Sequence, residues 1–252
     1  MIANSLLKQA FEQRRALKVI SGLQNFDHHK VAAVVKAATA GGATFVDIAA
    51  DADLIKQVKA ITHLPVCVSA VEPAKFVAAV EAGADLIEIG NFDSFYGQGI
   101  RFEAPEVLEL TRQTRALLPE VTLSVTVPHI LELDQQVQLA QDLVEAGADI
   151  IQTEGGTSSN PNHPGALGLI EKATPTLAAA YAISRGVDVP VLCASGLSSV
   201  TAPMAIAAGA WGIGVGSAIN KLDDEVAMVA VVRSLVEALS SVSYNSVDLL
   251  QK

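Results

Sequence analysis

Eight short runs of apolar, mostly β-branched residues recur along the chain, and helical segments separate them. Each run is continuously apolar rather than alternating, which is typical of parallel strands that are covered on both faces. The pattern predicts a parallel sheet with strands at residues 18–22, 45–49, 66–70, 86–90, 122–127, 150–154, 191–195 and 212–216.

The segments between these runs carry helix start and stop signals. Several begin with a proline in the first turn or with Asp or Thr at the N-cap, and most end in Ala-Gly-Ala, where glycine supplies a left-handed stop. Examples of the predicted helices are residues 30–40, 73–82, 105–118, 134–146, 168–185 and 201–208. Eight alternations of strand and helix predict the α/β class. They also predict one domain over residues 1–252, a single (β/α)8 TIM barrel of the phosphate-binding type with a short N-terminal helix.

A repeated segment that begins with Gly-Ala relates strands 2, 4, 6 and 8 of the predicted barrel, although βα units also resemble one another without any duplication. It places Asp47, Glu88 and Gln152 at equivalent positions. A charged side chain in mid-strand must point into the lumen, because the other strand face meets apolar helices. We therefore expect the three side chains in one inner layer. The layer below is expected to be an apolar floor of Phe45, Leu86, Ile150 and Gly212. The layer above is expected to be a cavity lined by Ala49, Gly90, Glu154 and Gly216.

Three carboxylates, those of Asp47, Glu88 and Glu154, are candidates for acid–base catalysis. Within one confined site they would repel one another and raise at least one pKa, which suits a general acid or base. Glu154 also lies at the carboxyl end of its strand, where TIM barrels carry their catalytic groups. For Asp47 and Glu88 the alternative is a buried polar network that sets barrel geometry, with Lys18 neutralising one of them.

Two glycine turns follow the last two predicted strands, at Ser195-Gly196 and Gly216-Ser217. Glycine lets backbone N–H groups approach an anion closely, and a helix that begins there adds the positive end of its dipole. In TIM barrels a phosphate commonly binds between the loops after strands 7 and 8. We predict these four residues as phosphate contacts; the alternative is that the glycines only form tight turns.

Further candidates for substrate binding lie in the loops after strands 5 and 6. Gly155 and Gly156 open a long polar loop and offer backbone donors, Thr126 is expected to point inward, and His129 follows strand 5 directly. The loop after strand 4, residues 91–102, is rich in aromatic residues that either cover a planar ligand or pack onto the barrel rim.

Composition and charge exclude several classes of function. The net charge of −10 argues against a nucleic-acid-binding surface, and no run of 18 apolar residues is present to span a membrane. The two cysteines form no CxxC motif, which favours a reduced, cytoplasmic protein without a zinc site. No His, Asp and Glu cluster shows metal-ligand spacing, although a transient Mg²⁺ at Asp47 or Glu88 stays open. Lys18 is expected at the wrong end of its strand for Schiff-base chemistry.

Three runs of sequence, at residues 18–27, 87–93 and 151–159, resemble the hypothetical chloroplast reading-frame family of cyanobacteria and algal plastids. The resemblance covers nearly the whole chain and implies an aldolase-type barrel in a cyanobacterial or plastid-stroma setting, but no activity. Residues 190–218 are similar, more loosely, to the phosphate-binding end of pyridoxal-phosphate synthase, thiazole synthase and flavin-dependent nitronate monooxygenases. This likeness implies phosphate contacts at Ser195, Gly196, Gly216 and Ser217. The first two families use a strand lysine that has no evident counterpart here.

These observations predict a protein that binds a small phosphorylated metabolite and catalyses proton transfer as a lyase, isomerase or synthase. A flavin mononucleotide (FMN) oxidoreductase is one alternative, with the same turns holding the cofactor phosphate. A non-catalytic metabolite sensor or assembly subunit is the other. A homo-oligomer is compatible with each of these three functions. The sequence identifies no substrate.

Overall fold

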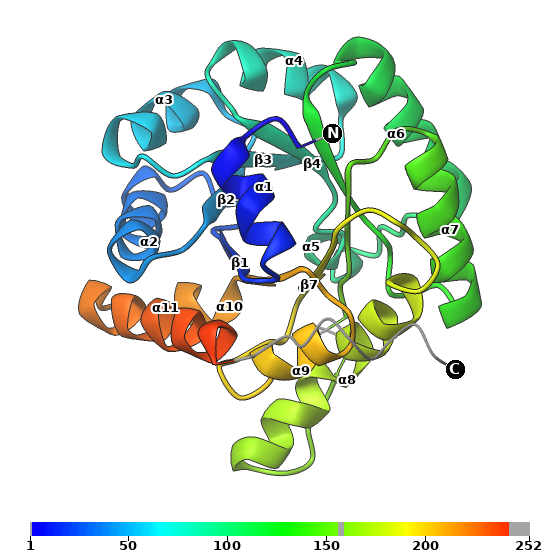
Figure 1. The fold of residues 1–252 in the computed structure, drawn as a ribbon. Coiled ribbons are helices and arrows are strands. Elements are labelled where there is room, and N and C mark those ends of the chain that lie inside the picture. The colour runs from blue at the N-terminus through cyan, green and yellow to red at the C-terminus, as the bar shows by residue number, and fades with distance from the viewer. Residues whose placement is uncertain (1, 156–158, 242–252) are drawn as a thin grey trace.

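The computed structural model describes residues 2–155 and 159–241. Within these ranges eight parallel strands close into a barrel in sequence order, with β8 paired to β1. Figure 1 shows the helices as a ring around the strands. The structure thereby confirms the predicted TIM barrel. The strands are β1 (Ala16–Ile20), β2 (Phe45–Ala49), β3 (Val66–Ala70), β4 (Leu86–Ile89), β5 (Thr122–Thr126), β6 (Ile150–Gln152), β7 (Val191–Ala194) and β8 (Gly212–Val215).

The main difference from the predicted strands concerns β1, which begins and ends two residues earlier than expected. Lys18 is therefore at the centre of β1 and fully buried, and the expectation that it lies at the strand's end was wrong. The start of β1 was predicted too late because the charged Lys18 interrupts the apolar run of the strand. β4 to β8 end one or two residues before their predicted ends, because the backbone turns into the loops of the barrel mouth.

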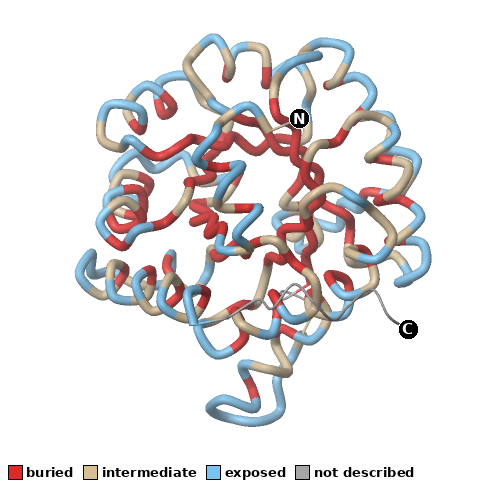
Figure 2. Tube along the Cα trace, in the orientation of Figure 1, coloured by how far each residue is buried: buried red, intermediate tan, exposed pale blue. Residues whose placement is uncertain are grey.

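The predicted helices are all present, and each begins and ends within three residues of its expected bounds. Their buried faces pack on the outer side of the barrel, as Figure 2 shows by the burial along the chain. The helices are α1 (Ser5–Glu12), α2 (His28–Gly41), α3 (Ala52–Ile61), α4 (Pro73–Glu81), α5 (Asp93–Tyr96), α6 (Ala104–Leu117), α7 (Leu133–Glu145), α8 (Gly165–Ile183), α9 (Ala202–Ala207), α10 (Ser217–Asn220) and α11 (Glu225–Ser240).

Helix α1 closes the amino-terminal end of the barrel, where it lies across the opening in Figure 1. Its buried residues Leu7 and Phe11 pack against an apolar layer, and the rings of Phe11 and Phe45 lie 6.2 Å apart. Leu86 and Ile150 belong to the same cluster. The predicted apolar floor is thus confirmed, and the opposite, carboxyl-terminal end of the barrel remains available for a site.

The layer above this floor is polar and holds the three predicted residues together. Glu88 accepts a hydrogen bond from Gln152 Nε2 at 2.8 Å and pairs with Lys18 Nζ at 2.7 Å. Asp47 lies 3.9 Å from the same Lys18 Nζ. None of these side chains is more than 1% exposed. Because all of them meet inside the barrel rather than at the helices, the predicted inner layer is confirmed.

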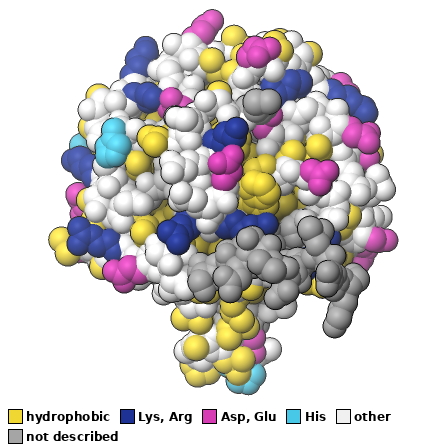
Figure 3. All heavy atoms as spheres, viewed as in Figure 1, with side chains coloured by type: hydrophobic (Ala, Val, Ile, Leu, Met, Phe, Trp, Pro, Cys, Tyr) yellow, Lys and Arg dark blue, Asp and Glu magenta, His cyan; other side chains and the backbone are white. Residues whose placement is uncertain are grey.

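The outer surface carries mixed charge on the face that Figure 3 shows, with apolar side chains concentrated on the segment that projects below the barrel. This projection is the start of α8, where Leu167 and Leu169 are exposed. No helix in the described part of the chain is long and apolar enough to cross a membrane. The assignment of residues 1–252 to one domain stays a prediction, because residues 242–252 lie outside the described ranges.

Candidate functional site

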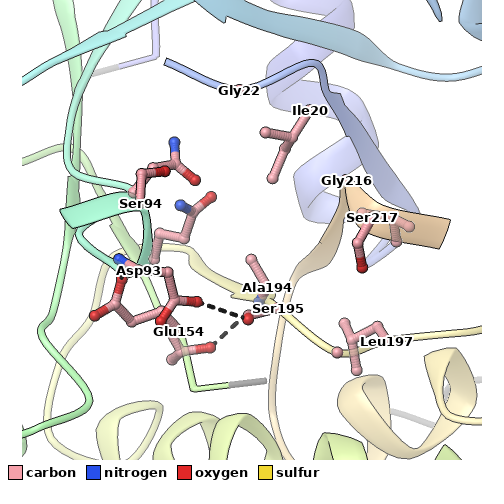
Figure 4. Close-up of a pocket in the computed structure, with 15 residues that line it drawn as sticks. Ile20, Gly22, Asp93, Ser94, Glu154, Ala194, Ser195, Leu197, Gly216 and Ser217 are labelled. Carbon is pink, nitrogen blue, oxygen red and sulfur yellow. Dashed lines mark hydrogen bonds between the residues drawn. The ribbon is translucent and has the colours of Figure 1, made fainter. Parts of the chain in front are cut away.

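A cavity of about 200 Å³ opens at the carboxyl ends of the strands, between α5 and the loops after β6, β7 and β8. Figure 4 shows Asp93 and Glu154 on one side of it, with Gly216 and Ser217 on another. The position agrees with the general rule that ligands of TIM barrels bind at this end. Its lining consists of Ile20, Gly22, Asn91, Asp93, Ser94, Gln152, Thr153, Glu154, Ala194, Ser195, Gly196, Leu197, Val215, Gly216 and Ser217.

Glu154 is the most constrained acid of this cavity, only 4% exposed although it lines the wall. Tyr96 donates its hydroxyl to Oε1 at 2.6 Å, and the backbone N–H of His129 donates to the same oxygen at 3.2 Å. The backbone N–H of Asp93 donates to Oε2 at 3.2 Å. Burial, which outweighs the hydrogen bond from His129, raises the pKa of Glu154. This carboxyl group can therefore carry a proton more readily than an exposed glutamate.

The turn after β4 brings Asp93 and Tyr96 to Glu154. Gly90 has a φ of +145°, and a side chain there would collide with Thr126, so glycine allows β4 to end close against β5. Asn91 follows with a φ of +62°, and the one-turn helix α5 begins at Asp93. The loop whose aromatic residues were predicted to cover a planar ligand or to pack onto the barrel rim thus supplies an acid and a phenol to the site. Its rings divide: Phe92 and Phe102 are buried and stack 4.6 Å apart, whereas Tyr96 contacts the ring of His129.

His129 lies next to both carboxylates of the cavity wall. Its Nδ1 is 3.1 Å from Glu154 Oε1 and 3.3 Å from Asp93 Oδ1. Burial disfavours the charged imidazolium, but the hydrogen bond with Glu154 and the charges of Glu154 and Asp93 outweigh it and raise the pKa of His129. His129 does not itself line the cavity, so it approaches the two acids from behind the wall.

The two glycine turns border the same cavity, with all four predicted phosphate contacts in its lining. Ser195 and Gly196 have φ values of +78° and +76°, and a left-handed conformation is costly for serine, at about 1–3 kcal/mol. Ser195 donates its hydroxyl to Asp93 Oδ2 at 2.9 Å, a contact that joins the turn after β7 to the acid of α5. Gly216 precedes α10, and the first N–H groups of a helix have no acceptor within it.

The polar layer of the lumen lies directly beneath this cavity. Asn91 Nδ2 is shared among Asp47 Oδ2 at 3.3 Å, Ser69 Oγ at 3.3 Å and Glu88 Oε1 at 3.2 Å. Asn91 lines the cavity, whereas Asp47 and Glu88 do not. The predicted catalytic acids are therefore separated: Glu154 faces the cavity, and the other two lie below it.

Electrostatics in the lumen layer hold one permanent positive charge against two carboxylates. Burial opposes charging of Lys18, but Glu88 and then Asp47 outweigh it, so the pKa of Lys18 is raised and its amine stays protonated. Burial, only partly offset by Lys18, raises the pKa of Asp47 to about 6. Ser69 donates to Asp47 at 2.5 Å and Ser124 donates to Glu88 at 2.8 Å, which satisfies the remaining acceptors.

Two further predicted substrate contacts, Thr126 and Gly155, are not among the residues that line the cavity. Thr126 accepts a hydrogen bond from Gln152 beneath the turn after β4, and Gly155 packs near Pro175 and His129. Gly156 lies outside the described residues. Their roles in binding stay predictions.

Asp93 was missed as a site residue, and Tyr96 was considered only as one of the aromatic residues that cover a planar ligand or pack onto the rim. Asp93 and Tyr96 stand three residues apart in a loop whose aromatic content drew attention away from Asp93. One signal was the acid that follows a strand end directly, since such positions form the barrel mouth.

One set of side chains could hold a cation. Ligand atoms of Asp93, His129 and Glu154 all lie within 4.8 Å of one another. These residues come from the loops after β4, β5 and β6, so their spacing along the sequence did not suggest a metal site.

Barrel, cavity and turn positions together define a TIM barrel of the aldolase type. Among the solved structures that share this fold, "Wild-type GGGPS from Thermoplasma volcanium" superimposes with a TM-score of 0.64 at 13% identity, over 96% of this chain and 100% of that chain. 3-Hexulose-6-phosphate synthase gives 0.60 at 18% identity, over 88% and 99%. Thiamine phosphate pyrophosphorylase from Pyrococcus furiosus gives 0.58 at 17%, over 90% and 96%. At these identities the likeness shows the fold alone.

The chain belongs to the family described as "Protein of unknown function (DUF561)", which matches residues 2–245. It is 43% identical to the "Uncharacterized protein ycf23" of Cyanophora paradoxa over 249 residues, 97% of this chain and 99% of that protein. It is 40% identical to the protein of the same name from Porphyra purpurea, over 96% of this chain and 91% of that protein. The predicted family resemblance is confirmed.

Proposed function

We propose that this protein is an acid–base enzyme that binds a small phosphorylated metabolite in the cavity at the barrel mouth. The observation that carries the proposal is the position of Glu154. Its buried carboxyl group, with a raised pKa, lines the same cavity as the turns after β7 and β8. A phosphate at those turns and a proton-transfer group in the adjoining wall are the two parts that a lyase, isomerase or synthase of this kind needs.

The four turn residues take the role of phosphate contacts in this proposal. Backbone N–H groups at Gly196, Gly216 and Ser217 supply donors, since no lysine or arginine among the described residues lines the cavity. Binding then depends on the shape of the turns rather than on a charged side chain. Asp47 and Glu88 take a supporting role, because they lie below the cavity and are fully buried.

Glu154 takes the role of the acid or base, and its neighbours hold it in place. Tyr96 and two backbone N–H groups fix both oxygens, which leaves the carboxyl group in a single orientation toward the cavity. A fixed group whose pKa is raised toward neutrality transfers a proton more effectively than an exposed one. Asp93, tied to Ser195, shares the wall and sets the local charge.

The cavity volume supports a small metabolite over a flavin. At about 200 Å³ it lies below the roughly 300–1,000 Å³ typical of sites for drug-sized ligands. A triose to pentose phosphate matches this volume better than flavin mononucleotide does. A cytoplasmic or stromal location and a homo-oligomeric state both stay predictions.

A binding experiment tests the phosphate contacts. Inorganic phosphate and a panel of triose, tetrose and pentose phosphates are titrated by calorimetry into the parent chain and into Gly216→Leu. We expect at least one sugar phosphate to bind and Gly216→Leu to lose it. Gly97→Leu is the matched control, because Gly97 has an ordinary φ and no atom within 4 Å of an added Cβ. Equal affinity in the parent and Gly216→Leu places the phosphate elsewhere.

A second experiment tests the acid–base role. The bound sugar phosphate is incubated in deuterated water, and exchange at carbon is followed by mass spectrometry. We expect deuterium to enter with the parent chain and not with Glu154→Gln, while Glu154→Gln still binds the ligand. Exchange that persists in Glu154→Gln assigns the proton transfer to another group.

A further inference from the structure

We propose that Asp93, His129 and Glu154 together bind one divalent transition-metal ion in the wall of the cavity. Each side chain contributes one atom: Oδ1 of Asp93, Nδ1 of His129 and Oε1 of Glu154, so in the ion-bound chain Glu154 acts as a base through its other oxygen, Oε2, rather than as an acid. Nδ1 lies 3.1 Å from Oε1 and 3.3 Å from Oδ1. An ion with bonds of about 2.0–2.2 Å holds neighbouring ligand atoms roughly 3.0–3.5 Å apart. The two separations from Nδ1 suit such an ion, and all three ligand atoms lie within 4.8 Å of one another.

The donor set indicates the class of ion. One imidazole nitrogen and two carboxylate oxygens match Zn²⁺ and Mn²⁺ better than Mg²⁺ or Ca²⁺, which prefer oxygen alone. Three protein ligands also leave coordination positions for a water or a substrate oxygen, as in catalytic sites. Because Asp93 and Glu154 line the cavity and His129 lies behind them, those open positions face the cavity.

The three ligands are themselves held by surrounding donors. Ser195 donates to the second oxygen of Asp93, at 2.9 Å. Tyr96 donates to Glu154, and the N–H of Asp93 fixes its other oxygen. Metal sites depend on such outer contacts to orient their ligands. The left-handed conformation of Ser195, unusual for a serine, serves to place this hydroxyl on Asp93.

Gln152 provides an independent sign of a ligand in this cavity. Its side chain lines the cavity and is 1% exposed, and its Nε2 donates to Glu88 and Thr126. Its Oε1 accepts no hydrogen bond from any residue that the structure describes. A buried carbonyl oxygen is costly without a donor. This oxygen lies toward β8, 3.6 Å from where a Cβ at Gly214 would stand, so a water or hydroxyl group of a ligand in the cavity supplies that donor.

A bound divalent ion would balance the negative charge of the cavity wall. The wall carries two carboxylates, and none of the described lining residues is a lysine or arginine. A phosphorylated ligand would therefore meet like charge, and a divalent ion between the carboxylates and the ligand removes that repulsion. This role rests on the proposed function, whereas binding of the ion itself does not.

The test uses the full chain and two ions without other ligands. Mn²⁺ binding is followed by loss of the free-ion paramagnetic resonance signal, and Zn²⁺ by competition. We expect one ion per chain in the parent. In Asp93→Asn and in His129→Phe the affinity falls by more than roughly 100-fold, since losing an outer partner alone costs about 10–100-fold. Phenylalanine keeps the ring that packs on Tyr96.

Asp53→Asn is the control for adventitious surface binding, because its side chain is 86% exposed and is not among the residues that line the cavity. It should bind the ion as the parent does. Bound Mn²⁺ should also show a nitrogen hyperfine coupling from the imidazole, absent in His129→Phe. The proposal is overturned if the parent binds neither ion at one per chain, or if both site variants bind as tightly as the parent.

Adding inorganic phosphate separates this proposal from the proposed function. A phosphorus coupling to bound Mn²⁺ supports both. Bound Mn²⁺ with its nitrogen coupling but without a phosphorus coupling keeps the metal site and contradicts the phosphate position. Phosphate binding by a chain that takes up no ion contradicts the metal site and keeps the proposed phosphate position.

Discussion

Two trios of charged residues lie one above the other in this barrel, and both combine two acids with one basic group. In the lumen the trio is Lys18, Asp47 and Glu88, all from strands and all fully buried. At the mouth it is His129, Asp93 and Glu154, all from the connections that follow strands, with Asp93 at the start of α5. Asn91 lies between them, as it contacts the lumen acids and lines the cavity.

The basic member distinguishes the two trios. The amine of Lys18 stays protonated at every physiological pH, so its positive charge balances the negative charge of the lumen acids permanently. Histidine changes its protonation near neutrality and can exchange its proton for a metal ion. We therefore expect the lumen trio to have a structural role and the mouth trio to bind ligands. Four predictions test this division, from the largest expected effect to the smallest.

Removing the lysine should produce the largest loss. Lys18→Met leaves Asp47 and Glu88 buried without their cation, which costs about 3–5 kcal/mol of the free energy of unfolding. Chemical denaturation at pH 7 measures it. The matched change Lys8→Met, at a lysine that is 56% exposed, should cost less than about 0.5 kcal/mol. A loss for Lys18→Met no larger than that would show the lumen trio to be dispensable.

The second prediction concerns the pH dependence of stability. The pKa of Asp47 is raised to about 6 in the folded state from an ordinary value of 3.8, so the folded chain binds this proton more tightly. The resulting stability is present below pH 4 and is lost as the pH rises through 6, on the order of 3 kcal/mol for two pKa units. Asp47→Asn should remove this decline. The free energy of unfolding is compared for both chains from pH 4 to 8, and parallel curves would contradict the assignment.

The same contrast explains what the sequence could and could not predict. Asp47, Glu88 and Gln152 lie at regular positions on strands, so strand periodicity alone placed them in one layer. Asp93 and Tyr96 lie in a loop that begins with two positive φ values, at Gly90 and Asn91. No periodic rule relates such a loop to the loops after β5 and β6. The fold was therefore predictable in full outline, and Glu154 and His129 were candidates from the sequence, whereas the place of Asp93 beside them required coordinates.

The third prediction tests how Glu154 is held. Tyr96→Phe removes one donor from its carboxylate but keeps the ring that contacts His129 at 5.1 Å. Because the N–H groups of Asp93 and His129 still donate to Glu154, the expected loss is about 1 kcal/mol. Tyr181→Phe, at a tyrosine that is 55% exposed, is the control and should cost less. Thermal and denaturant unfolding of the two variants measure the difference.

The last prediction compares equivalent substitutions in the two trios. Glu88→Gln removes the carboxylate that pairs with Lys18 Nζ at 2.7 Å. The buried amine of Lys18 then has only one acid of the trio left, Asp47, at 3.9 Å. It should cost several kcal/mol, in line with a broken buried pair.

Glu154→Gln, in contrast, removes the cost of burying a charged carboxylate, which is the cause of the raised pKa of Glu154. Asp93 still lies 3.3 Å from His129 Nδ1. The gain from a neutral side chain offsets part of the cost of a backbone N–H that loses its acceptor, so the free energy of unfolding should fall by about 1 kcal/mol, well below the loss for Glu88→Gln. Denaturant titrations of both variants at pH 7, with circular dichroism as the signal, measure the two changes together. If Glu154→Gln destabilised the chain as much as Glu88→Gln, the mouth trio would be a second structural network. A small change beside a large one leaves Glu154 held in place at the mouth for a purpose other than folding.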